Sequence, residues 1–368
     1  MEKIILGKTG LRATVAGLGC GGFSRIGIEK YGQDHAAGIV RAAFDEGVNF
    51  FDTAAAYGTE SAVGQGLDGI ARDKYILSTK YPYKWGGEWK ANGGDKLMAS
   101  LENSLRELRT DYIDIYHLHG VTQEDYADAR DILLPAMHKA RDQGKIGFLG
   151  ITELFYSDTA HAMLNVAVPE NLFDVIMVGY NILNPSAAKF ILPKTAELNT
   201  GVLCMFAVRS ALSNPEQLVT DLKKIISRGQ AGEGLLAASK DALDFLIAGE
   251  TCVAGESCAA GETGSANETG ETSETGETGA AMSANAAAVA AAATAAASAR
   301  RQPVASTIME AAYRFCRHTP QIHVVLTGTG NAGHLRDNLR SINSPPLPDA
   351  VLERLEAMFG QVDCVSGQ

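Results

Sequence analysis

The sequence is poor in basic residues, in cysteine pairs and in long apolar runs. Its 368 residues include 32 Lys and Arg against 43 Asp and Glu. The net charge of −11 offers nucleic-acid phosphates no general attraction, so no nucleic-acid partner is expected. The six cysteines form no Cys-x-x-Cys pair, which indicates free thiols in a reducing compartment. Residues 1–10 contain glycine and lysine where a secretory signal needs an apolar segment, so we expect a cytoplasmic protein.

Two common dehydrogenase signatures are missing or incomplete. Residues 17–22, Gly-Leu-Gly-Cys-Gly-Gly, match the pattern Gly-x-Gly-x-x-Gly, but the residues after them do not read as the helix that would hold a diphosphate. No Tyr is followed four positions later by Lys, the pair that short-chain dehydrogenases use. We therefore interpret residues 17–22 as a loop after a strand and expect no Rossmann domain.

One long segment, residues 248–302, lacks the composition of a folded domain. It has no aromatic side chain, it repeats Gly-Glu-Thr, and it includes an alanine run at 280–299. So little apolar surface cannot offset the entropy of ordering the chain, which predicts a disordered insert. The Ser, Asn and Thr within the alanine run make it too weakly apolar for a membrane span, so no membrane partner is expected. The remainder, residues 1–247 and 303–368, has the composition of a single domain.

This remainder alternates short apolar runs with amphipathic segments. The predicted strands are 14–18, 48–52, 75–80, 112–117, 146–151, 174–178, 202–206 and 322–326. The predicted helices are 34–46, 96–108, 126–142, 186–198 and 304–318. Eight strands that alternate with helices predict an α/β fold, a (β/α)8 TIM barrel with the insert after its seventh strand. Gly144 and the Asn-Thr-Gly at 199–201 are expected to end helices, and the long connection after residue 208 is attributed to the insert.

Polar side chains lie at the ends of three consecutive predicted strands. Asp52 ends the second strand, Lys80 the third and His119 the fourth, and Tyr57 follows Asp52 in the loop. The carboxyl ends of barrel strands meet at one rim, where barrel enzymes place their catalytic residues. Each residue alone has a structural explanation as a cap, a packed ring or a polar core group. Together, in this order, they predict a catalytic site.

His117 and His119 allow a second interpretation, a metal-dependent hydrolase. Side chains two apart on a strand point to the same face and can share a metal ion. Barrel hydrolases recruit further ligands from later strand ends, whereas the remaining histidines considered fall on helical patterns or begin a strand. We therefore expect no metal site and interpret His117 as a hydrogen-bonded histidine of the barrel interior.

The four rim residues resemble the tetrad of the aldo-keto reductase superfamily, whose Asp, Tyr, Lys and His correspond to Asp52, Tyr57, Lys80 and His119. The likeness covers nearly all of the chain outside the insert and includes residues 6–11, 104–116, 144–150 and 328–338. It implies an oxidoreductase that transfers a hydride between a nicotinamide cofactor and a carbonyl or alcohol substrate, an aldehyde, ketone or aldose.

The resemblance implies a role for each member of the tetrad. Tyr57 would be the general acid in reduction and the base in oxidation. A phenol with an ordinary pKa of ~10 is a poor donor near neutrality, so Lys80 is expected to lower that pKa while Asp52 orients Lys80. His119 would hydrogen-bond the substrate oxygen.

The resemblance also implies residues that contact the cofactor. Thr152 and Glu153 stand where the family usually has Ser-Asn for the carboxamide, and Met177 where it often has Gln. Phe206 is expected either to stack on the nicotinamide or to pack in the core. The segment that resembles the adenosine-binding region supplies four further candidates, Gly328, Thr329, His334 and Asn338.

The expected cofactor preference follows from the absence of cationic side chains at the positions that would bind a 2′-phosphate. A 2′-phosphate calls for fixed cationic donors, usually Arg, and the family's basic positions correspond to Gly328 and His334. We therefore expect NAD to be preferred over NADP, with Arg336 as the residue that can overturn this expectation.

The substrate is expected to be a small carbonyl compound or a sugar. Tyr83 and Trp85 lie in the loop after Lys80, where aromatic faces can hold a sugar ring or simply cover the barrel mouth. An NAD-preferring sugar dehydrogenase is the leading hypothesis. A non-catalytic cofactor-sensing module that acts by binding a partner is the alternative from another class.

Overall fold

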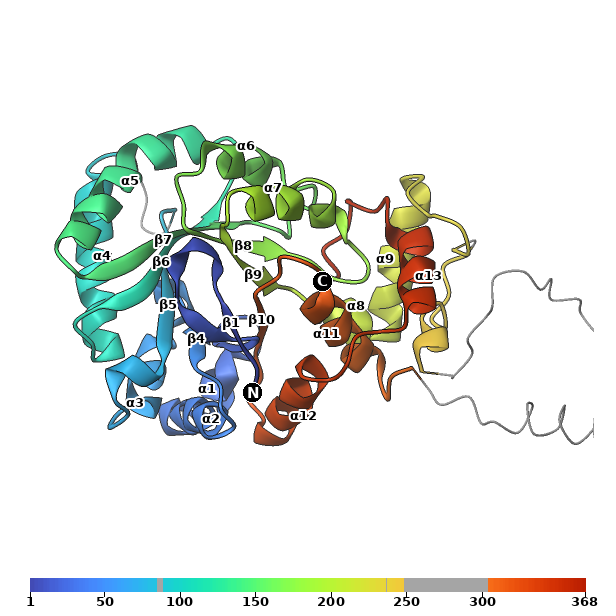
Figure 1. Ribbon diagram of the computed structural model, residues 1–368, viewed down its shortest axis with the longest axis horizontal. Helices are drawn as coiled ribbons and strands as arrows, with labels where there is room; N and C mark the ends of the chain where they lie inside the picture. The colour runs from blue at the N-terminus through green and yellow to red at the C-terminus, as the bar shows by residue number, and fades with distance from the viewer. Residues whose placement is uncertain (85–88, 236, 248–303) are drawn as a thin grey trace, which may run out of the picture.

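The fold is a closed barrel of eight parallel strands (Figure 1). The computed structural model describes residues 1–84, 89–235, 237–247 and 304–368, so the predicted insert at 248–302 lies outside the described residues. The strands are β3 (Ala16–Gly19), β4 (Phe50–Asp52), β5 (Ile76–Tyr81), β6 (Ile113–Val121), β7 (Ile146–Glu153), β8 (Val175–Gly179), β9 (Gly201–Met205) and β10 (Val324–Thr327). β10 pairs with both β9 and β3 and closes the barrel. The predicted (β/α)8 fold is confirmed.

Helices surround the barrel (Figure 1). The longer helices are α2 (Gln33–Asp45), α3 (Glu60–Gly66), α4 (Gly93–Leu108), α5 (Tyr126–Asp142), α6 (Ala162–Glu170), α7 (Ile191–Glu197), α9 (Pro215–Ser227), α11 (Ile308–His318), α12 (Ala332–Ile342) and α13 (Asp349–Phe359). Two short helices, α1 (Ile28–Tyr31) and α8 (Ser210–Ser213), follow β3 and β9. The predicted segment 186–198 divides into a 3-10 turn and α7.

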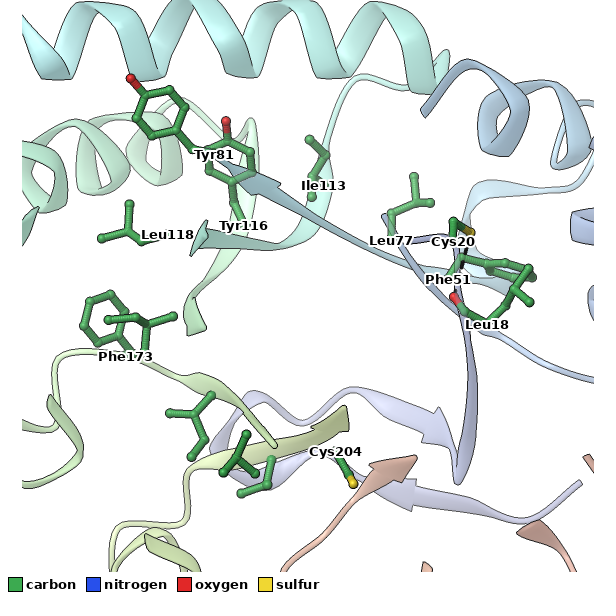
Figure 2. Close-up of a cluster of buried hydrophobic side chains, with 14 of the residues drawn as sticks. Leu18, Cys20, Phe51, Leu77, Tyr81, Ile113, Tyr116, Leu118, Phe173 and Cys204 are labelled. Carbon is green, nitrogen blue, oxygen red and sulfur yellow. Dashed lines mark hydrogen bonds between the residues drawn. The ribbon is translucent and has the colours of Figure 1, made fainter. Parts of the chain in front are cut away.

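The main core lies between the strands and the helices. Figure 2 shows Leu77, Tyr81 and Tyr116 on the outer side of their strands, with the two tyrosines directed at the helix above them. Such outward side chains are almost fully buried, as are Leu97 and Leu101 on α4. Burial of these apolar side chains supplies the main stabilisation of the barrel wall.

A hairpin that the sequence analysis did not predict packs against one end of the barrel. β1 (Lys3–Ile5) pairs with β2 (Arg12–Thr14), so the predicted strand at 14–18 is in fact the end of β2 followed by β3. Leu6 and Ala13 cluster with interior side chains that lie early in their strands, among them Phe50 and Val324. The hairpin therefore fills the end of the barrel opposite the carboxyl ends of the strands.

The expected helix stop at residues 199–201 is only partly correct. Gly144 has a left-handed conformation, with φ 72°, as predicted for the end of α5. Before β9, however, Asn199 is the left-handed residue, with φ 50°, and Gly201 is the first residue of the strand. A Cβ atom at Gly201 would lie 2.9 Å from Cγ of Leu6, so this glycine makes room for the hairpin.

The connection after β9 is not one continuous loop as predicted, because α8 and α9 lie within it. Asn214 caps α9 by accepting a hydrogen bond from the Glu216 amide, and Pro215 occupies the first turn. Leu218 and Leu222 of α9 belong to a second apolar cluster that also contains Leu355 of α13. α9 and α13 lie side by side in Figure 1.

In the part of the chain that the structure describes, no helix combines the length and the apolar character that a bilayer crossing requires.

Candidate active site

Residues 17–19 belong to the end of β3 and only residues 20–22 lie in the loop between β3 and α1, so the prediction of a loop at 17–22 is partly correct. A turn and a 3-10 segment at Arg25–Gly27 follow β3, so the first long helix, α2, begins only at Gln33. Gly21 lies against the ring of Tyr57, because a Cβ atom there would be 2.5 Å from Cε2 and 2.6 Å from Cζ of the tyrosine. The glycine-rich loop thus provides space for a phenol rather than the start of a dinucleotide-binding helix.

Asp52 and Lys80 form a buried ion pair inside the rim. The ammonium donates to Oδ2 of Asp52 at 2.6 Å and to the carbonyl of Thr53 at 2.7 Å, and the Lys80 side chain is 0% exposed. β4 and β5 are neighbours in register, and Ser78 on β5 pairs with Asp52 on β4. Ser78 Oγ donates to the other carboxylate oxygen at 2.7 Å. The carboxylate is therefore held from both sides.

Tyr57 and His119 complete the predicted tetrad. The Tyr57 hydroxyl lies 3.3 Å from Nε2 of His119, and their rings meet edge to face with centroids 5.3 Å apart. The Lys80 ammonium lies 5.1 Å from the centroid of the Tyr57 ring. The structure therefore brings all four side chains to one place, with the pair of Asp52 and Lys80 behind Tyr57.

The protonation tendencies follow from burial. Burial raises the pKa of Tyr57 and Lys80 lowers it, with a net rise, so the predicted lowering by Lys80 is outweighed. Burial and then the charge of Lys80 lower the pKa of His119 to about 3, which keeps the imidazole neutral near pH 7. Burial alone lowers the pKa of Lys80, but Asp52 and Tyr57 together produce a net rise. Lys80 is thus an ammonium beside a neutral phenol.

His117 lies deeper in the barrel, as predicted. Its side chain is fully buried, and Nε2 lies 3.1 Å from Ser78 Oγ, which links it to Asp52. Gly150 makes room for the imidazole, because any Cβ atom there would overlap Nδ1 of His117. In the residues that the structure describes, no group of three or more potential metal ligands occurs.

A cavity of about 400 Å³ opens beside Tyr57. It is lined by the loop after β3, by Asp52 and Tyr57, by Met177 on β8, and by the ends of β9 and β10. A second cavity of about 610 Å³ adjoins it, and four residues line both: Val208, Ser213, Tyr313 and Gly328. Together they offer an elongated site that extends from the phenol toward α12.

The candidate residues for the adenosine end lie in or next to the second cavity. Gly328, Thr329, His334 and Asn338 line it. The Asn338 amide donates to Thr327 Oγ1 at 2.9 Å, and this hydroxyl lies 2.8 Å from that of Tyr313. Arg336 does not line this cavity, whereas Asp337 does.

Of the candidate residues for the nicotinamide end, Phe206 lines the first cavity, whereas Thr152 and Glu153 do not. Phe206 lines the first cavity and has a left-handed backbone, with φ 69°. Thr152 is buried and accepts a hydrogen bond from the Gly120 amide at 2.7 Å. Glu153 is buried and lies 2.9 Å from Nδ1 of His161. Neither Thr152 nor Glu153 lines the first cavity, so their assigned contacts to the carboxamide stay predictions.

Of the two candidate substrate residues in the loop after β5, only Tyr83 is described, and its contacts do not support the assignment. Tyr83 is 1% exposed, and its hydroxyl donates to Asp125 at 3.0 Å instead of facing Tyr57. Trp85 lies outside the described residues.

Phe23 and Arg209 are among the residues of the first cavity that the sequence analysis did not identify. Phe23, in the loop after β3, is 82% exposed, and Arg209 follows β9 directly before α8. Both occupy loops at the carboxyl ends of barrel strands, and this position alone was a signal that could have identified them.

We expect Gly21→Ala to lower turnover by about 10- to 100-fold, because the added methyl group displaces the Tyr57 ring from its position. Steady-state kinetics with a saturating aldehyde measure the effect. Gly38→Ala is the matched control, since a Cβ atom at this exposed position of α2 meets nothing within 4 Å. Equal turnover of the two variants would contradict the assignment of Gly21.

Comparisons with known proteins agree with this fold. The family model described as "Aldo/keto reductase family" matches residues 17–359. In structure, the chain is similar to an aldo-keto reductase of Bacillus halodurans (TM-score 0.58, 21% identity, 97% of this chain and 95% of that one). It is also similar to an aldo/keto reductase of Klebsiella pneumoniae in complex with NADP and acetate (TM-score 0.59, 19% identity, 99% and 98%).

Two curated relatives are similar in sequence. L-galactose dehydrogenase of Arabidopsis thaliana is 32% identical over 211 residues, which are 55% of this chain and 64% of that protein. Aldo-keto reductase YhdN of Bacillus subtilis is 32% identical over 191 residues, which are 47% of this chain and 55% of that protein. The match thus spans less than two thirds of each relative. The family match itself covers most of the chain, and the protein belongs to the aldo/keto reductase family.

Proposed function

We propose that the protein interconverts a small carbonyl compound or aldose and its reduced or oxidised partner, with Tyr57 as general acid and base. The observation that carries the proposal is the position of Tyr57, which lines a cavity beside the buried pair of Lys80 and Asp52 and whose hydroxyl lies 3.3 Å from Nε2 of His119. Family membership favours this function over the metal-dependent hydrolase that the pair of His117 and His119 had suggested.

We assign the role of proton donor to Tyr57 by elimination within the tetrad. Burial and the charge of Lys80 lower the pKa of His119 to about 3, so at neutral pH it lacks the acidic proton of an imidazolium. Lys80 is 0% exposed and is bound to Asp52 and Thr53. Tyr57 lines the cavity with its hydroxyl protonated, because burial raises its pKa. A substrate oxygen near Tyr57 and His119 would receive the phenolic proton in reduction and return it in oxidation.

Lys80 stabilises the phenolate that Tyr57 becomes after it donates. An ammonium near the ring favours the charged form of the phenol, and Asp52 keeps the ammonium oriented. Because this arrangement is present before substrate binds, little reorganisation accompanies proton transfer. The nicotinamide, when bound, supplies or accepts the hydride.

The adjoining cavities fit a dinucleotide. Their shared lining at Val208, Ser213, Tyr313 and Gly328 gives one elongated site with Tyr57 at one end and His334 at the other. Phe206 would contact the nicotinamide end. Thr329 and Asn338 would contact the adenosine end, and Thr152 and Glu153 remain candidates for the carboxamide.

We propose that NAD is preferred over NADP. Around the second cavity Arg340 is paired with Asp337 at 3.1 Å, and Arg336 is not part of the lining. A 2′-phosphate would therefore meet the Asp337 carboxylate without a free arginine fork among the described lining residues.

We expect kcat/KM to be higher with NAD than with NADP, and His334→Arg to shift the ratio toward NADP by about tenfold, as one charge-assisted pair can. Absorbance assays with both cofactors against aldehydes, ketones and aldoses measure the ratio. His138→Arg on the outer helix α5 is the control. A strong NADP preference of the wild type would contradict the proposal, and tight NADH binding without turnover of any substrate would indicate a cofactor-sensing module.

The leading substrate class is a sugar, because one similar protein is an L-galactose dehydrogenase.

Residues 1–247 and 303–368 are proposed to form a single domain, which is supported by the pairing of β10 with β9 and β3.

A further inference from the structure

Arg209 brings a positive charge to the cavity beside Tyr57. It follows β9 and lines the first cavity together with Tyr57. Its guanidinium carbon lies 3.9 Å from the centroid of the Phe206 ring and 5.6 Å from that of the Phe23 ring. Cation–π contact with these rings fixes where the guanidinium lies.

The guanidinium has no anionic partner within the described chain. It forms neither an ion pair nor a hydrogen bond with any described residue, in contrast to Arg72 and Arg314, which are bound by carbonyl groups and carboxylates. The other charged residue of the lining, Asp52, is already neutralised by Lys80. A half-buried charge without a partner is unfavourable, and such a cost is typical of a group kept for binding.

We propose that Arg209 binds a carboxylate or phosphate group of the substrate, so that the enzyme acts on anionic carbonyl compounds such as sugar acids or sugar phosphates. This inference rests on the proposed oxidoreductase function. A guanidinium whose face lies against an aromatic ring presents its N–H donors at its edge, where they match two oxygens of a carboxylate or phosphate. Phe23, 82% exposed at the rim, offers an apolar face to the rest of the substrate.

The position of Arg209 indicates which of two anions it can reach, an anionic group of the substrate or the diphosphate of the cofactor. A diphosphate that joins the two ends of the site would lie near the junction of the cavities, where Val208, Ser213 and Gly328 line both. Arg209 lines only the cavity that contains Tyr57. The geometry therefore favours the reacting molecule over the diphosphate.

The test compares 4-carboxybenzaldehyde with methyl 4-formylbenzoate, two aldehydes that differ by one negative charge. We expect Arg209→Gln to lower the ratio of their kcat/KM values by about 10- to 100-fold, and Arg209→Lys to lower it less. Arg228→Gln, at the exposed end of α9, is the control and should leave the ratio as in the wild type. An unchanged ratio in Arg209→Gln would overturn the proposal.

A fluorescence titration with NADH tests whether Arg209 binds the diphosphate of the cofactor instead of an anionic group of the substrate. If Arg209→Gln weakens NADH binding tenfold and lowers kcat/KM equally for both aldehydes, Arg209 holds the cofactor diphosphate and the proposal is wrong. An NADH dissociation constant within threefold of the wild type supports the proposal.

Calorimetric titration with benzoate separates this inference from the proposed function. We expect benzoate to bind the wild type and Tyr57→Phe but not Arg209→Gln. If the wild type binds benzoate through Arg209 yet reduces neither aldehyde, the oxidoreductase proposal fails while the anion site stands. If turnover occurs and benzoate affinity is independent of Arg209, the anion site is refuted and the proposed function stands.

Discussion

Replacing Tyr57 by Phe is expected to lower kcat for carbonyl reduction by about 10²- to 10⁴-fold, the usual contribution of general acid catalysis. The ring that packs on Gly21 and contacts His119 is retained, and only the hydroxyl at the cavity is lost. The variant should therefore fold normally and bind NADH with a dissociation constant close to that of the wild type. Stopped-flow reduction of a saturating aldehyde measures the chemical step directly.

The matched control for this variant is Tyr156→Phe, which removes a hydroxyl from a tyrosine that is 59% exposed in the loop after β7. Its kcat should equal that of the wild type. Turnover of Tyr57→Phe within threefold of the wild type would remove Tyr57 from the mechanism.

The pH dependence of the wild type follows from the same group. The proton-donating form of Tyr57 is present below its raised pKa and is lost above it. His119, with a pKa of about 3, does not change charge between pH 5 and pH 9. The kcat for reduction should then be constant from about pH 5 to about pH 9 and decline only above about pH 10. An inflection near pH 6.5 would indicate a titrating histidine and contradict this assignment.

The second large effect is expected from Lys80→Met, which should lower the free energy of unfolding by about 3–5 kcal/mol. It leaves Asp52, which is 3% exposed, without the charge that offsets its burial. Urea denaturation followed by circular dichroism measures the loss. Adding Asp52→Asn to this variant should recover part of the stability, because the remaining polar group is neutral and can still accept from Ser78.

Lys194→Met is the control for an exposed pair. Lys194 bonds Glu197 at 2.6 Å on the surface of α7, and its loss should cost less than about 0.5 kcal/mol. If Lys80→Met costs no more than Lys194→Met, or if the double variant is less stable than the single one, the pair of Asp52 and Lys80 does not have the energetic role assigned to it.

The barrel was predictable because its strands are short apolar runs separated by amphipathic helices, and the tetrad because strand ends converge in this fold. The hairpin of residues 3–14 was not predictable in the same way. Its strands have three residues each, and its contacts are with side chains distant in sequence such as Phe50 and Val324. α9 was not predicted although Asn214 and Pro215 signal its start. The long connection after residue 208 was attributed to the insert at 248–302, so the helical pattern within that connection was overlooked.

Lys80 lowers the pKa of Tyr57 as predicted, but burial, which the sequence analysis did not weigh, raises this pKa by more. The sequence shows which charge stands near the phenol but not how far the phenol is removed from water, and burial is the larger influence. Arg209 was missed for a related reason. The sequence does not distinguish one loop arginine from another. The structure shows that Arg209 has no anionic partner among the described residues and lines the same cavity as Tyr57.

The pairing of β10 with both β9 and β3 has a consequence for synthesis of the chain. Seven of the eight barrel strands leave the ribosome before residues 248–302 are translated, while the eighth follows them. Until that strand emerges, the backbone edges of β3 and β9 stay unpaired, and such edges are the places where nascent chains associate wrongly. The barrel can close only at the end of translation, so the time spent on residues 248–302 is time during which those two edges need protection.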